Sequence, residues 1–139
     1  MDAADPIGAA LRDMPREYVP RFKALLEESW RGEDALRALL QQYEATVRAV
    51  APFVEFLNLD DVQRLLTACR ALLTVTATRP DASVRQLVQG AVLYLVLEED
   101  DEEITGVLGL DDDAQVVNAA CRSLGHDEWV VTLGPRYEG

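Results

Sequence analysis

Nine carboxylates lie within residues 97–115 of this 139-residue chain, and the stretch contains no basic side chain. Six form one run, Glu98, Glu99, Asp100, Asp101, Glu102 and Glu103, and three follow as Asp111, Asp112 and Asp113. Carboxylates bind hard cations, attract basic proteins, or stabilise the first turn of a helix. Residues 98–113, here called the acidic segment, are therefore the candidate functional site.

A divalent-cation site is one interpretation of this segment. Read as a twelve-residue calcium loop, residues 101–112 place Gly106 at the sixth position, where an EF-hand has its glycine. Position three is Glu103 and position twelve is Asp112, so the loop departs from the EF-hand pattern. A looser Ca²⁺, Mg²⁺ or Mn²⁺ site is the remaining cation hypothesis, and its expected ligands are Asp100, Asp101, Glu103, Asp112 and Asp113.

The charge distribution points instead to a basic partner. The net charge is −12, and residues 86–121 carry nine acids and no Lys or Arg, whereas the rest of the chain has 13 bases against 16 acids. This imbalance argues against binding to nucleic acids or anionic membranes. Asp111–Asp113 fit a helix start, but residues 98–103 follow a predicted helix end, where negative charge is unfavourable. We therefore expect Glu98–Glu103 to contact a basic protein.

No catalytic motif is present. The single histidine, His126, lies in a polar stretch after a predicted helix and is more typical of a solvated or C-capping imidazole than of a general base. The chain has no Gly-x-Ser-x-Gly elbow, phosphate-binding loop or zinc-ligand cluster. We expect a non-enzymatic binding protein, for example of the inhibitor or immunity type, with no cofactor unless a divalent cation binds.

The apolar periodicity predicts an all-α fold: one domain over residues 1–139, folded as a single compact bundle of about five helices. Helices are expected near 20–30, 33–50, 59–77, 82–98 and 111–124, after a short helix or turn at 5–13. From residue 91 the fourth is apolar all round, which is typical of a central helix. Gly90 suggests a close helix approach. Residues 84–125 should form a helical hairpin, and residues 126–139 a short tail that docks Trp129.

The remaining features suggest an ordinary cytoplasmic protein. The hydrophobic fraction of 49% is enough for a core, and no apolar run is long enough to span a membrane. The N-terminus lacks the pattern of a signal peptide. Cys69 and Cys121 fall on apolar helix faces, so we expect two buried, reduced thiols. A long apolar helix in so small a domain also suggests a homodimer.

Residues 91–125 resemble the core of the YkvA-like domain, a bacterial domain of unknown function. The similarity lies in Tyr94-Leu95-Val96, in Asp100, in Val107-Leu108-Gly109 and in the pair Asp112-Asp113. Both prolines of the family's loop are replaced by acids in this chain. The resemblance implies a helical hairpin and no established activity. It marks Asp100, Asp112 and Asp113 as the residues that would inherit any shared role.

Overall fold

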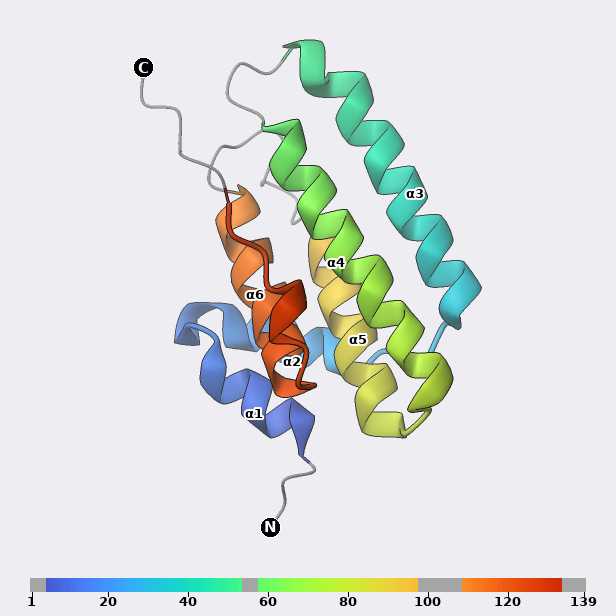
Figure 1. Cartoon of the computed structure of the whole chain (residues 1–139), viewed down its shortest axis with the longest axis vertical. Coiled ribbons are helices and arrows are strands. Elements are labelled where there is room, and N and C mark those ends of the chain that lie inside the picture. The colour runs from blue at the N-terminus through green and yellow to red at the C-terminus, as the bar shows by residue number, and fades with distance from the viewer. Residues whose placement is uncertain (1–4, 54–57, 98–108, 134–139) are drawn as a thin grey trace.

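The computed structural model describes residues 5–53, 58–97 and 109–133 (Figure 1). Its α-helices are α1 (Pro6–Asp13), α2 (Val19–Leu26), α3 (Glu33–Val50), α4 (Leu59–Thr78), α5 (Ala82–Val96) and α6 (Gly109–Ser123). Three short 3-10 helices are η1 (Arg16–Tyr18), η2 (Ala51–Phe53) and η3 (Asp127–Trp129). No strand occurs in these ranges, so the predicted all-α bundle is confirmed, with six α-helices instead of about five. None of the described helices is both long and apolar enough to cross a membrane.

Helix α5 lies at the centre of the bundle, where it packs against α1, α2, α3, α4 and α6. Residues 87–95 are all buried, as expected for a helix that is apolar around its whole circumference. The helices of the same chain therefore cover the surface that suggested a homodimer. α5 and α6 also pack together and run in opposite directions, as a helical hairpin requires (Figure 1).

Gly90 allows α2 to approach α5 closely. A Cβ atom at this position would lie 3.0 Å from Cε1 of Phe22 and 3.1 Å from Cδ2 of Leu26. Phe22 is fully buried, so its ring has little room to move away. The close approach expected from the sequence is thus confirmed, and its cause is the missing side chain rather than helix propensity.

Two predicted helix ends are observed with their capping residues. The side chain of Asn58 accepts hydrogen bonds from the backbone N–H groups of Asp60 and Asp61, at 2.9 and 3.2 Å, and so caps α4. After α6, Gly125 has a φ of 82°, which suits glycine. The N–H of His126 then reaches the carbonyl of Cys121 at 2.9 Å, which closes the turn.

Three helix boundaries differ from the sequence-based prediction. α2 ends at Leu26 instead of about residue 30, α5 ends at Val96 instead of 98, and α6 begins at Gly109 instead of 111. The buried side chain of Gln89 accepts from the N–H of Arg31 at 2.8 Å and donates to the carbonyl of Ser29 at 2.9 Å. These bonds hold the chain after α2 in a non-helical path. A contact made from α5 therefore overrides the helical pattern of residues 27–30.

Candidate functional site

The acidic segment joins α5 to α6, and the structure describes only its last part. Six predicted partner-binding residues, Glu98, Glu99, Asp100, Asp101, Glu102 and Glu103, lie outside the described residues. Asp111, Asp112 and Asp113 are described, and they lie inside the first turns of α6 rather than ahead of it. Asp113 is buried, whereas Asp111 and Asp112 are half-buried. Negative charge at these positions stabilises the helix N-terminus.

Asp112 is linked to η1 by Tyr18. The phenol of Tyr18 hydrogen-bonds to the carboxylate of Asp112. Burial, followed by the negative charge of Asp112, raises the pKa of Tyr18 to about 12. The phenol therefore stays protonated at neutral pH and remains a donor. Asp112 is in this way a structural link between α6 and the turn before α2, in addition to any role in binding.

The C-terminus of α5 is capped by Arg21 from α2. The guanidinium lies 4.2 Å from the ring centroid of Tyr94 and donates hydrogen bonds to the carbonyls of Tyr94, at 3.4 Å, and Leu97. A cation here satisfies helix-end carbonyls and offsets the negative end of the helix dipole. Acids that follow a helix are electrostatically unfavourable, because they meet the negative end of its dipole. Arg21 relieves part of that cost, and no local sequence pattern shows it, because 73 residues separate it from Tyr94.

The predicted cation site is only partly described. Of its five expected ligands, Asp112 and Asp113 are placed at the start of α6, and Asp100, Asp101 and Glu103 lie outside the described residues. Within the described ranges, no three His, Cys, Asp or Glu side chains are grouped so that they could hold a metal ion. The cation site therefore stays a prediction that depends on the other three carboxylates.

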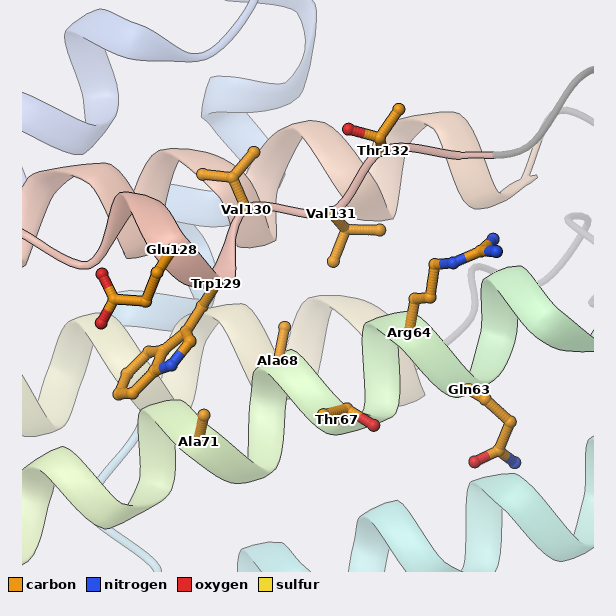
Figure 2. A pocket seen from close by; sticks show the side chains of 10 residues that line it. All are labelled: Gln63, Arg64, Thr67, Ala68, Ala71, Glu128, Trp129, Val130, Val131 and Thr132. Atoms are coloured by element: carbon orange, nitrogen blue, oxygen red, sulfur yellow. The ribbon is translucent and has the colours of Figure 1, made fainter.

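A groove that the sequence did not reveal lies between α4 and the chain after α6 (Figure 2). Its volume is about 510 Å³. We call it the α4 groove; its lining residues are Gln63, Arg64, Thr67, Ala68, Ala71, Glu128, Trp129, Val130, Val131 and Thr132. The small side chains on α4 are what keep it open. In the sequence, Thr67, Ala68 and Ala71 do not differ from ordinary helix residues, because the apolar periodicity does not show which residues pack opposite them.

Residues 126–133, here called the C-terminal segment, form the second wall of the groove. After η3 the chain is extended, with Val130 at φ −63° and ψ 133°. Val131 donates to Oδ1 of Asn118 at 2.7 Å and accepts from Nδ2 at 2.9 Å. Asn118 is buried on α6, so these two hydrogen bonds fix the C-terminal segment to the bundle. The expectation that the tail docks on the helices is confirmed for the part that the structure describes.

His126 and Glu128 lie at one end of the groove. The imidazole stacks on Trp129, with the ring centroids 4.0 Å apart and the planes 5° apart. Its Nδ1 lies 2.8 Å from Oε2 of Glu128, and this contact lowers the pKa of the Glu128 carboxyl. Of the two roles expected for the ring, solvated or C-capping, the structure shows a partly exposed imidazole that stacks on Trp129.

Both cysteines are free thiols, and both are buried as predicted. Burial is the main reason that the pKa of Cys121 is raised to about 12, and burial raises the pKa of Cys69 further still. The Sγ of Cys121 lies 3.9 Å from the carbonyl of Trp129, beneath the C-terminal segment. A raised pKa disfavours the thiolate, so burial lowers the reactivity of both thiols in this fold.

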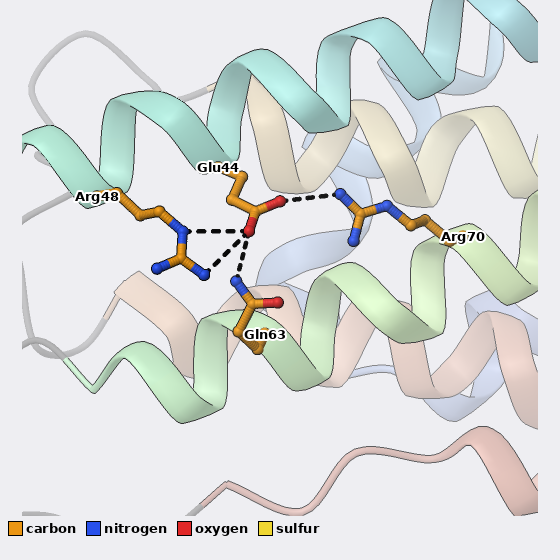
Figure 3. Close-up of polar contacts among 4 residues, drawn as sticks. All are labelled: Glu44, Arg48, Gln63 and Arg70. Atoms are coloured by element: carbon orange, nitrogen blue, oxygen red, sulfur yellow. Dashed lines mark hydrogen bonds and ion pairs between the residues drawn. The ribbon is translucent and has the colours of Figure 1, made fainter.

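Glu44 joins α3 to α4 through a set of charged and polar contacts (Figure 3). Its carboxylate accepts from Gln63 at 2.7 Å, from Arg70 at 3.0 Å and from Arg48 at 3.2 Å. The hydrogen bond from Gln63, and next that from Arg70, lowers the pKa of Glu44 to about 2. The group is therefore ionised at neutral pH and fully engaged, which suits a structural brace and not an acid–base catalyst.

The fold and these sites define a small all-α bundle with an acidic helical hairpin. No protein-family model, no curated protein and no solved structure matches the chain. The resemblance to the YkvA-like domain therefore stays a prediction from the residues quoted above.

Proposed function

We propose that this protein is a small, non-enzymatic binding protein whose acidic segment engages a basic protein partner. The observation that carries the proposal is the concentration of charge: the net charge is −12, and the acidic segment holds nine of the 25 acids with no base. Attraction of opposite charges speeds encounter and sets specificity. An inhibitor or immunity-type protein that masks a basic toxin or nuclease is the specific version that we favour.

The packing of the described helices supports this proposal. α5 is buried on all sides and its C-terminus is capped by Arg21, while Asp112 at the start of α6 is tied to Tyr18. The C-terminal end of α5 and the first turn of α6, which the acidic segment connects, are thus both held by residues 18–21.

The test is capture of partners from host-cell lysate by wild-type protein and by the double variant Asp101→Lys, Glu102→Lys. We expect the variant to lose the captured protein. We also expect affinity for the purified partner to fall steeply between about 50 and 500 mM salt. Glu27→Lys with Asp34→Lys is the matched control, because it changes the net charge equally at two exposed acids elsewhere. Salt-insensitive binding, or equal loss in both double variants, contradicts the proposal.

A divalent cation is the alternative ligand for the same carboxylates. This alternative is favoured by the negative potential at the start of α6. The pKa of Tyr94 is raised to about 12, first by burial and then by the negative charge of Asp112, to which Asp113 adds. Calorimetric titration with Ca²⁺, Mg²⁺ and Mn²⁺ tests it. Binding heat that is lost in Asp112→Asn supports a cation site. Absence of heat, together with an unchanged melting temperature at millimolar metal, removes it.

A further inference from the structure

The C-terminal segment presents a main-chain edge beside the α4 groove. The side chain of Val131 points to one side of the segment, and those of Val130 and Thr132 point to the other (Figure 2). This alternation is that of a β-strand, in which neighbouring residues direct their N–H and C=O groups to opposite sides. The side chain of Asn118 forms hydrogen bonds with both the N–H and the C=O of Val131. The backbone groups of Thr132 therefore face away from α6, and among the described residues neither has a hydrogen-bond partner.

The groove next to this edge has the size and lining of a peptide site. Its volume of about 510 Å³ falls within the range of roughly 300 to 1,000 Å³ that is common for ligand sites. Ala68 and Ala71 on α4 leave room opposite Trp129, whose indole points toward Ala71 (Figure 2). An apolar side chain fits between them, while the chain that carries it runs along the exposed edge.

The charges along the groove favour a basic ligand. Arg64 lies at one end of the groove. Its Nη1 is 2.5 Å from Oδ1 of the buried Asp61, so the carboxylate of Asp61 balances the positive charge of Arg64. Glu128, at the other end, is 60% exposed, and its partner His126 is charged only when protonated. Asp127 is exposed beside it. The open end near Trp129 is therefore negative at neutral pH.

We propose that the α4 groove binds an extended basic peptide by strand addition along Thr132. The backbone of the peptide pairs with the N–H and C=O of Thr132, an apolar side chain lies between Trp129 and Ala71, and a Lys or Arg side chain meets Glu128. A second copy of this chain is a poor occupant, because its own net charge is −12. The site uses no residue of the acidic segment, so it stands independently of the function proposed above.

The decisive variant removes one backbone donor and leaves the side-chain lining nearly unchanged. Thr132→Pro deletes the N–H of an exposed residue, and the alternating side chains of residues 130–132 indicate the extended chain that a residue before proline prefers. Thr132→Val keeps the N–H and is the matched control. The probe is the C-terminally amidated peptide Lys-Val-Thr-Val-Thr with a tetramethylrhodamine label, which adds no net charge. The comparison peptide has the same sequence with N-methylated central amides. Fluorescence anisotropy measures both.

We expect Thr132→Pro to weaken binding of the probe about tenfold, as the loss of one hydrogen bond implies, and Thr132→Val to leave it unchanged. The N-methylated peptide should bind as weakly to wild type as the probe binds to Thr132→Pro. Glu128→Lys should weaken binding at low salt and have little effect at high salt. The double variant Asp101→Lys, Glu102→Lys should bind the probe with at least half of the wild-type affinity.

Four results overturn the proposal. They are equal affinity of the proline and valine variants, no binding up to about 1 mM peptide, loss of binding in the acidic-segment variant, and self-association in sedimentation experiments that Thr132→Pro abolishes. The third assigns the peptide to the acidic segment, and the fourth assigns the groove to a second copy of the chain.

Discussion

Asn118 and Val131 are paired through both atoms of the Asn118 amide and both backbone groups of Val131, at 2.7 and 2.9 Å. A single buried side chain on α6 thus does what a neighbouring strand does in a sheet. This pairing holds the C-terminal segment over α6 and so keeps Cys121 covered.

Replacing Asn118 by Ala should release the C-terminal segment. Two buried hydrogen bonds are lost, and we expect the free energy of unfolding to fall by about 1 to 3 kcal/mol. Cys121, beneath this segment, should then react faster with a thiol reagent such as iodoacetamide. Cys69 is the internal control, because it is buried on α4. Mass spectrometry of the labelled peptides separates the two sites. Equal acceleration at both would indicate global unfolding and contradict local release.

Replacing Gly90 by Ala should destabilise the bundle despite the better helix propensity of alanine. The propensity gain is up to about 1 kcal/mol, and overpacking a rigid core costs about 1 to 3 kcal/mol. Because the new Cβ meets the buried ring of Phe22 at 3.0 Å, we expect a net loss of about 1 kcal/mol. Phe22→Leu in the Gly90→Ala background should recover part of that loss. A double-mutant cycle by urea denaturation measures this, and strictly additive effects would disprove the contact.

Glu44 should make stability depend on acidic pH. Its folded-state pKa of about 2 lies below the ordinary value of 4.5, so its contribution is present above about pH 4.5 and is lost as the pH falls toward 2. Because the side chain is 23% exposed, we discount the shift for screening and expect Glu44→Gln to cost about 1 to 2 kcal/mol at pH 7. The variant and wild type should converge near pH 2. Chemical denaturation at several pH values measures the difference.

Glu33→Gln is the matched control for Glu44. Glu33 lies on the same helix and pairs with a single residue, Arg37 at i,i+4, whose Nη2 and Nε lie 2.7 and 2.9 Å from Oε2 of Glu33. Such pairs contribute about 0.3 to 0.5 kcal/mol, so this variant should show a small and weakly pH-dependent loss. Equal losses in the two variants would mean that the contacts from Gln63 and Arg70 add nothing.

Arg21→Met should destabilise the protein most at low salt. The variant loses the bonds to the carbonyls of Tyr94 and Leu97 and removes a cation from the C-terminal end of α5, at a cost of about 1 to 3 kcal/mol. Adding Asp101→Lys and Glu102→Lys should restore part of the loss. Melting temperatures at about 20 and 500 mM NaCl test this, and a salt-independent loss with no rescue would exclude electrostatic compensation.

The sequence was sufficient to predict the features that depend on local chemistry. The helical periodicity of the apolar residues located the helices. The side chain of Asn58 marked the start of α4, and Gly90 marked the close approach of another helix to α5. It was not sufficient where distant residues meet. α2 ends early because the side chain of Gln89, about 60 residues later in the chain, forms hydrogen bonds with the backbone that follows α2. Arg21 at the end of α5 and the opening beside Ala71 likewise depend on tertiary packing, which no periodic pattern contains.

The stack of His126 on Trp129 gives the α4 groove a built-in optical reporter. The chain has two tryptophans, and Trp30 lies elsewhere, with the guanidinium of Arg85 5.3 Å from its ring centroid. Replacing Trp30 by Phe leaves one indole, whose emission depends on its imidazole neighbour and on whatever enters the groove. A change in the emission of Trp129 therefore reports occupancy of the α4 groove without an attached dye.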